Sequence, residues 1–131
     1  MTIDDDDVEF DGDIVLFRGQ PLNGDVQEHY WNGTLKRESN YLNGFKEGCC
    51  REWHNNGSLS CEWHSKRGVI DGKKCEWHSN GNIKFLAFYS NGIEIICDEW
   101  DEHENHKSHR EINRNSDLYK YAISILNKPP S

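Results

Sequence analysis

The chain has 131 residues, of which 34% are hydrophobic and 29% are charged. This hydrophobic fraction is low for a domain with a thick globular core, and it favours a thin sheet or a stack of repeats. The net charge of −8 argues against nucleic acid and anionic membranes as direct ligands. It is compatible with a basic protein partner, and the plainer interpretation is that it only keeps the protein soluble. An aromatic share of 11% argues against disorder.

The first predicted unit is an acidic N-terminal segment, residues 1–15, which contains the run from Asp4 to Asp7. We expect no signal peptide, because no basic region precedes an apolar run, and no membrane helix, because no apolar stretch approaches about 18 residues. Five cysteines without a Cys-x-x-Cys pair do not form a disulfide framework or a zinc site, which favours a reducing, cytoplasmic compartment. They are Cys49, Cys50, Cys61, Cys75 and Cys97.

Residues 16–100 are predicted to form a β-sheet built from about four units of 24 residues. Several residue types return at this period through three copies, which is typical of repeat architectures. The repeated positions include Gly24, Gly48 and Gly72; Glu28, Glu52 and Glu76; Asn32, Asn56 and Asn80; Gly33, Gly57 and Gly81; Leu35, Leu59 and Ile83; and Gly44, Gly68 and Gly92.

Each unit is predicted to fold as strand, turn, strand, turn. Asn-Gly between short runs rich in aromatic residues indicates a hairpin, because both residues tolerate positive φ. A three-residue loop at 55–57, with Gly57 left-handed, places Trp53 opposite Leu59. One face is then predicted to carry Trp53, Leu59, Cys61 and Trp63, followed by Trp77, Ile83, Phe85, Ala87 and Tyr89; the other is predicted to carry Glu52, His54, Ser60, Glu62 and His64. The fold class is thus mainly β, a single elongated twisted antiparallel meander of repeated hairpins.

The pattern weakens after Gly92. Asp98-Glu99-Trp100 repeats the Glu-Trp pair one residue out of phase, and no Asn-Gly follows. Residues 101–115 are polar and are predicted to be a linker. A C-terminal helix is predicted over 116–127, packed on the sheet, because Ser116-Asp117 is a helix start signal and apolar residues follow at helical spacing.

The repeat resembles the MORN repeat in its shorter bacterial form. The resemblance rests on Tyr41-Leu42-Asn43-Gly44 with Gly48, on Trp53 to Leu59, and on Tyr89-Ser90-Asn91-Gly92, and it covers about two thirds of the chain. Proteins of this kind include YwqK-type antitoxins and immunity proteins, so the resemblance implies an elongated sheet, a protein-binding role and no catalytic residues. Members also occur in large DNA viruses and in proteins of unassigned role, which leaves a general scaffold without a toxin partner as the alternative.

The candidate binding residues lie in the triplet Glu-Trp-His, which occurs three times. Tryptophan is enriched at binding hot spots, and recurring acidic residues attract a basic partner. The plainer interpretation is that the tryptophans pack inward and the Glu and His side chains are solvated. The predicted partner-binding residues are Glu52, Trp53, His54, Glu62, His64, Glu76, Trp77 and His78.

Other candidate sites are weaker. His103, His106 and His109 could bind a metal on a helix, but their polar surroundings favour an exposed linker without a metal site. Cys61 and His64 lack an orienting third group, and no phosphate-binding or dinucleotide motif occurs. We therefore expect no catalytic residues, no cofactor and no enzymatic activity, and the sequence leaves the oligomeric state and the binding face open.

Overall fold

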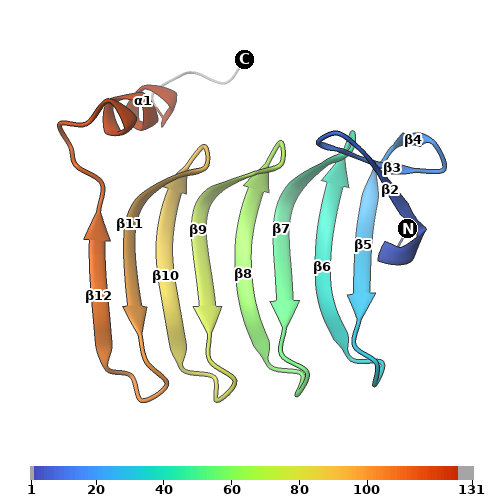
Figure 1. Ribbon diagram of the computed structural model, residues 1–131, viewed down its shortest axis with the longest axis horizontal. Helices are drawn as coiled ribbons and strands as arrows, with labels where there is room; N and C mark the ends of the chain where they lie inside the picture. Colours follow the sequence, from blue (N-terminus) through green and yellow to red (C-terminus); the bar gives the residue numbers. More distant parts are fainter. Residues whose placement is uncertain (1, 127–131) are drawn as a thin grey trace.

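The computed structural model describes residues 2–126, which form an open nine-stranded sheet, a small three-stranded sheet and one helix (Figure 1). The large sheet has the order β1-β5-β6-β7-β8-β9-β10-β11-β12, and the small sheet contains β2-β3-β4. The predicted antiparallel meander with a C-terminal helix is confirmed, with the exception that β1 pairs with β5 in parallel. The elements are β1 Thr2–Asp4, the 3₁₀ helix η1 Asp5–Asp7, β2 Val8–Asp11, β3 Ile14–Phe17, β4 Gln20–Pro21, β5 Gly24–His29, β6 Leu35–Leu42, β7 Phe45–Trp53, β8 Leu59–Lys66, β9 Val69–Trp77, β10 Ile83–Ser90, β11 Ile93–Trp100, β12 His106–Glu111 and α1 Asp117–Leu126.

Two kinds of turn alternate along the sheet. At one end, Asn43-Gly44, Arg67-Gly68 and Asn91-Gly92 all have positive φ at both residues, as a two-residue hairpin turn requires. At the other end the loops are longer. There Trp53 pairs with Leu59 and Gly57 has φ +89°, so the predicted loop with a left-handed Gly57 is confirmed.

A β-bulge in each longer hairpin changes which residues share a face. Glu52 pairs with Cys61, whereas the next residue Trp53 pairs with Leu59, so β8 carries one extra residue there. The register shifts in the same way between Ile83 and Phe85. The predicted division of faces is therefore wrong, because strict alternation does not allow for the extra residue. Glu52 shares a face with Cys61 and Trp63, and Trp53 shares the opposite face with Leu59, Glu62 and His64.

The most buried residues of the large sheet have small side chains. One row of cross-strand neighbours runs from β5 to β12, and its most buried members are short. The longer side chains of the row cover them: the guanidinium of Arg110, for example, lies 3.2 Å from the sulfur of Cys97. A single layer can bury Ser or Cys in this way, which explains the low hydrophobic content. The row is Val26, Ser39, Cys50, Trp63, Lys74, Ala87, Cys97 and Arg110.

The predicted linker at 101–115 is wrong, because the repeat continues through it. The amide of Asp101 donates to the carbonyl of Asn105, as that of His54 donates to Ser58 in the second unit. Strand β12 then pairs with β11 along its length. The turn escaped sequence analysis because Glu104, with φ +70°, stands where the other units have glycine.

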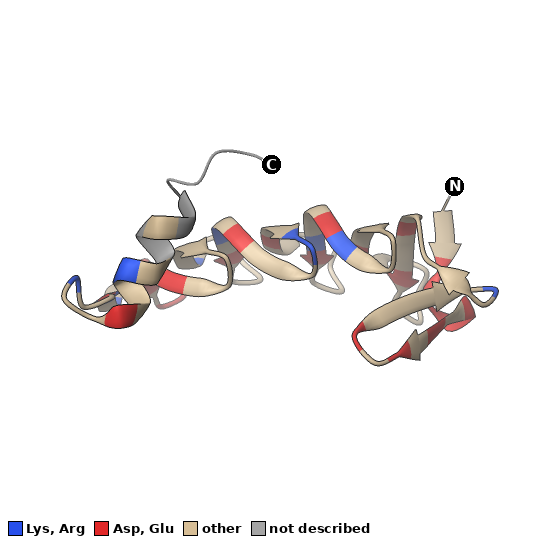
Figure 2. Ribbon diagram, turned by 90° about the horizontal axis from the view of Figure 1, so that it is seen from above, with Lys and Arg blue, Asp and Glu red and all other residues tan. Residues whose placement is uncertain are grey.

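The acidic N-terminal segment is folded. The β2–β3 hairpin lies over one face of β5 and β6, and Figure 2 shows the small sheet projecting from the side of the large one. A hydrophobic cluster fixes it there, formed by Ile3, Val15, Leu22 and Val26. Backbone bonds reinforce the contact, since the amide of Val15 donates to the carbonyl of Gly44 at 2.9 Å. We call the face beneath this hairpin the hairpin face and the opposite one the open face.

The helix α1 covers ten of the predicted residues, and Asn127 lies outside the described part of the chain. The hydroxyl of Ser116 accepts from the amide of Tyr119, which caps the helix as the sequence predicts. The helix contacts β10 and β11, but Leu118 and Tyr121 remain exposed. It therefore rests at the ends of these strands instead of covering a sheet face (Figure 1). Within residues 2–126, no helix combines the length and apolarity that crossing a bilayer requires.

Candidate partner-binding surfaces

The structure does not gather the predicted binding residues into one surface. Glu52 and Glu76 lie in one row of the hairpin face, because both pair with Cys61. Glu62 and His64 point from the open face, where they pair with Arg51 and Cys49. The predicted residues fall on both faces because successive side chains of a strand point to opposite faces of the sheet. The bulge shifts this pattern by one residue in every unit.

His54 and His78 have a structural role that the sequence analysis missed. The Nε2 of His54 donates to the carbonyl of Trp77 at 2.9 Å, and that of His78 donates to the carbonyl of Trp100 at 3.0 Å. In the first unit the hydroxyl of Tyr30 makes the same bond to Trp53 at 2.6 Å. These side chains therefore link each unit to the next. The sequence signal for this role was that a side chain able to donate a hydrogen bond recurs at this position every 24 residues.

The open face carries an aromatic stripe close to the longer loops. Trp53 pairs with Leu59, Trp77 pairs with Ile83, and these cross-strand pairs lie in successive units. All of these side chains are half-buried, so they contribute to packing and still offer apolar area to a partner. The stripe consists of Trp53, Leu59, Trp77, Ile83 and Trp100, whose ring contacts that of His106 at 5.6 Å between centroids.

The carboxylates of the hairpin face are largely neutralised by neighbouring cations. Arg37 bridges Glu28 at 3.0 Å and Glu52 at 3.2 Å. Lys74 lies 3.8 Å from Glu76, and Arg110 binds Glu99 at 3.3 Å. Such partly exposed ion pairs are worth less than about 1 kcal/mol each, but they reduce the negative potential of the sheet.

The negative charge is instead concentrated at the N-terminal end. Residues 1–23 contain seven of the Asp and Glu residues and one arginine, whereas residues 24–131 contain sixteen Asp and Glu against fourteen Lys and Arg. Figure 2 shows red segments in the small sheet and in the chain beside it at this end of the molecule. The carboxylates of Asp4, Asp5 and Asp6 lie within 4.8 Å of one another. Burial, followed by the negative charge of Glu28, raises the pKa of the Asp5 carboxyl. The predicted attraction of a basic partner therefore belongs to this end more than to the whole sheet.

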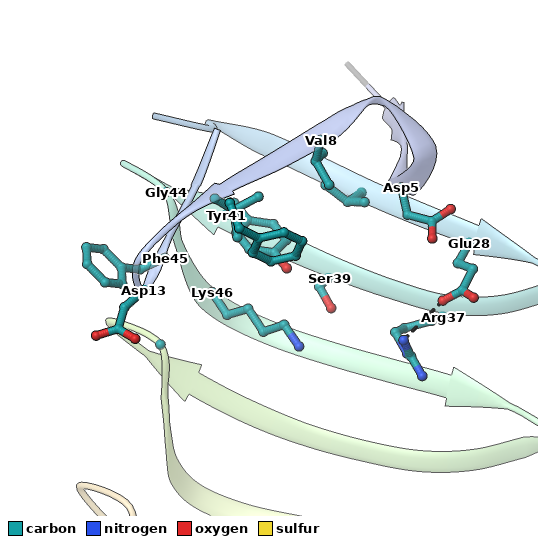
Figure 3. A pocket seen from close by; sticks show the side chains of 14 residues that line it. Asp5, Val8, Asp13, Glu28, Arg37, Ser39, Tyr41, Gly44, Phe45 and Lys46 are labelled. Carbon is teal, nitrogen blue, oxygen red and sulfur yellow. Dashed lines mark hydrogen bonds and ion pairs between the residues drawn. The ribbon is translucent and has the colours of Figure 1, made fainter. Parts of the chain in front are cut away.

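A cleft of about 440 Å³ separates the β2–β3 hairpin from the hairpin face (Figure 3). Its floor includes Ser39 and Tyr41 of β6, and its wall includes Val8 and Phe10. Burial raises the pKa of the Tyr41 phenol. The hydroxyl of Ser39, a residue only 3% exposed, has no hydrogen-bond partner among the described groups. Such an unpaired hydroxyl costs about 1–3 kcal/mol.

Sequence reasoning missed this cleft because its floor and its wall come from different parts of the chain. The acidic run was the only signal pointing to the region, since Asp5 lies at its edge. The pairing of the first strand with β5, which folds the hairpin back over the sheet, has no counterpart in the repeat pattern.

The sequence predicts Cys49, Cys61 and Cys75 to be small buried packing residues, which holds for Cys61 and Cys75 but not for the half-buried Cys49. All five have free thiols, and all but Cys49 are buried. Burial raises the pKa of the Cys61 thiol to about 12 and that of Cys97 to about 11, so both stay protonated at neutral pH. Cys61 and His64 point from opposite faces of the sheet, so they do not form a nucleophile and base pair.

The histidines near the C-terminus lie on a turn and a strand instead of a linker. His106 and His109 both donate to the same carboxylate oxygen of Asp98, at 2.9 and 2.7 Å. The second ring nitrogen of His109 lies 2.9 Å from a carboxylate oxygen of Glu111, so both nitrogens face carboxylates and the protonated imidazolium is favoured. Its pKa is raised by the hydrogen bond to Asp98 and then by that to Glu111. His103 stands apart in the turn, beside Glu102.

Comparison with known proteins identifies two of the units. A family profile described as MORN repeat variant matches residues 22–43 and 70–91. None of the curated proteins compared with the chain matches it. Among solved structures, the crystal structure of accessory secretory protein 1,2 and 3 in Streptococcus pneumoniae is similar over 93% of this chain, at 13% identity and a TM-score of 0.39.

The chain spans only 22% of the length of that streptococcal chain. MORN repeats are in general modules for interaction with proteins or membranes. This protein is thus a mainly β chain that contains two MORN repeat variants within an open sheet of repeated hairpins.

Proposed function

We propose that this chain is a non-catalytic protein-binding module of the antitoxin or immunity type, which neutralises a basic toxin by direct binding. The observation that carries the proposal is the aromatic stripe of the open face. Its half-buried tryptophans recur from unit to unit and leave apolar area accessible to a partner. Large rigid side chains of this kind are the commonest binding hot spots.

The nature of the partner follows from charge and from the repeat. The acidic N-terminal end favours a basic protein, because opposite charges accelerate encounter and suppress wrong partners. The resemblance of the repeats to those of YwqK-type antitoxins supports a toxin as that protein. The raised pKa values of the buried thiols support a role without covalent chemistry.

The proposal is tested by expressing the protein together with the product of the neighbouring gene. We expect growth to be rescued and the two proteins to purify as a complex. Trp77→Ala should weaken this complex by about thirtyfold, the loss typical of a hot-spot tryptophan. Calorimetric titration gives the affinity, and urea unfolding confirms that the variant is folded.

Trp31→Ala is the matched control. Trp31 is 92% exposed in a loop and lies outside the stripe, so its removal should change the affinity less than twofold. A neighbouring toxin that still kills cells in the presence of this protein would remove the antitoxin role. A stable partner shared with other proteins and without toxicity would instead assign the chain to the scaffold class.

A further inference from the structure

We propose that the cleft beneath the β2–β3 hairpin receives an arginine side chain of the basic protein partner. The inference rests on the proposed function, and it names the group that enters and the residues that receive it. The cleft volume of about 440 Å³ lies within the range of about 300–1,000 Å³ that is usual for ligand sites. The side chain enters together with flanking residues of the partner.

The charges of the cleft favour a cation. Its own cations are directed elsewhere, since Arg37 binds Glu28 and Glu52, and the ammonium of Lys46 lies over the ring of Trp63 at 5.5 Å. The carboxylates of Asp5 and Asp13 also line the cleft, and no described cation pairs with either (Figure 3). An entering guanidinium supplies the missing positive charge.

The buried hydroxyl of Ser39 provides a second observation that points to a ligand. It lines the floor of the cleft between Tyr41 and Arg37 in Figure 3, and it lacks a partner among the described residues. A hydroxyl accepts as well as donates, so it can take one N–H of a guanidinium while Asp5 takes another. Arginine offers five donors in a planar fork and can satisfy both, whereas lysine presents a single point charge.

The apolar wall suits the remainder of the arginine side chain. Val8 and the ring of Tyr41 face the cleft, and Phe10 stands at its edge with 75% of its surface exposed. The methylene groups of arginine pack on such surfaces, and its guanidinium stacks on aromatic rings. An occupant would cover the exposed ring of Phe10, which packs little within the chain itself.

The inference is tested by nuclear magnetic resonance titration with the tripeptide acetyl-Leu-Arg-Leu-amide. We expect saturating shifts of the backbone amides of Val8, Ser39 and Tyr41. The neutral analogue with Gln in place of Arg should bind about tenfold more weakly, the usual loss for a hydrogen bond to a charged group. Equal binding of the Gln peptide, preference for a Glu peptide, or shifts that are not localised at the cleft would overturn the inference.

Two substitutions separate contact from long-range charge. Asp5→Asn should weaken binding of the Arg peptide about tenfold, whereas Asp7→Asn, which removes the same charge outside the cleft, should weaken it less than twofold. Ser39→Ala should weaken binding about threefold without lowering Tm, because it removes an unpaired hydroxyl from the free protein. Equal effects of the two aspartate variants, or a fall in Tm for Ser39→Ala, would contradict the proposed site.

The outcomes distinguish this inference from the proposed function. If the tripeptide does not bind but the whole protein still binds its partner through Trp77, the cleft inference falls and the protein-binding role stands. If the tripeptide binds as described but no protein partner is neutralised, the arginine site stands and the proposed neutralising function falls. Shifts of the same amides on raising the protein concentration alone would assign the cleft to a second copy of this chain and overturn the arginine site.

Discussion

Glu104 occupies a backbone position that glycine fills in the preceding units. Its φ is +70°, close to the +85° to +91° of Gly33, Gly57 and Gly81. A side chain is strained in this left-handed region, and the glycine at the equivalent position carries no such strain.

We expect Glu104→Gly to stabilise the protein by about 1 kcal/mol, or roughly 4 °C in Tm, because it removes this strain. Glu102→Gly serves as the control, since Glu102 lies in the same turn without positive φ and its replacement adds only chain entropy. Thermal unfolding followed by circular dichroism measures both. A lower Tm for Glu104→Gly would show that this turn does not share the geometry of the others.

The Asp98 carboxylate makes part of the stability depend on pH. Hydrogen bonds from His106 and then His109 lower the pKa of Asp98, while its bond to His109 raises the pKa of that imidazole. The contribution of His109 is present below its unfolded value of about 6.5 and is lost as pH rises through its higher folded pKa. The contribution of Asp98 is present above about 3.9 and is lost as pH falls through its lower folded pKa.

We therefore expect Asp98→Asn to lower Tm more at pH 5.5 than at pH 8, because the His109 imidazolium is fully formed at the lower pH and is lost as pH rises through its raised pKa. Asp71→Asn is the matched control: its carboxylate accepts from the backbone amide of Asn91 and meets no histidine, so its effect should be the same at both values. A loss for Asp98→Asn that is independent of pH would contradict the charged pair.

Among the structural elements, the β2–β3 hairpin is held by one turn of the repeat. The carbonyl of Gly44 accepts from the amide of Val15, and a side chain added at Gly44 would collide with Ile14 and the carbonyl of Val15. At Gly57, which has nearly the same φ, an added side chain meets nothing within 4 Å. The two glycines therefore differ mainly in their surroundings, because the β2–β3 hairpin packs against Gly44 and no described residue packs in this way against Gly57.

We expect Gly57→Ala to cost about 1 kcal/mol, from φ alone, and Gly44→Ala to cost at least about 1 kcal/mol more, from crowding of the hairpin. Urea unfolding measures the difference, and faster hydrogen exchange at the Val15 amide should report local release of the hairpin in Gly44→Ala. Equal costs would mean that the hairpin does not lie on this turn.

Elements that repeat were predictable from the sequence, and elements that break the repeat were not. The Asn-Gly turns, Gly57 and the pairing of Trp53 with Leu59 follow from local turn chemistry. The bulge after Leu59 carries no residue that marks it, so the faces were assigned wrongly. The last turn was not predicted, because Glu104 stands in place of glycine and positive φ is not expected at glutamate.

The candidate site was predicted less well than the fold. The recurrence of the tryptophans is visible in the sequence, but their grouping into a stripe depends on the bulges. The cleft depends on packing between residues distant in the chain, such as Asp5 and Ser39, which no local pattern encodes.

At the scale of the whole molecule, the fold is a single layer whose units are joined only to their neighbours. The Nε2 of His54 and that of His78 each reach one unit ahead, and at the other edge the amide of Gly68 donates to Lys46 while that of Gly92 donates to Ile70. Stability is then a sum over neighbouring units, and both faces stay open to partners outside the N-terminal hairpin. This architecture, rather than a buried pocket of reactive groups, supports a role in binding.

Small-angle X-ray scattering on the monomer tests this account most directly. Eight strand-to-strand steps of about 4.8 Å make the sheet about 38 Å wide, which predicts a radius of gyration of roughly 17 Å for an extended single layer. A compact domain of the same length would give about 14 Å. A value near 17 Å, with the elongated profile of a flat slab, is what the open meander predicts. A value near 14 Å with a globular profile would contradict the single-layer sheet and the exposed faces on which the proposed binding role depends.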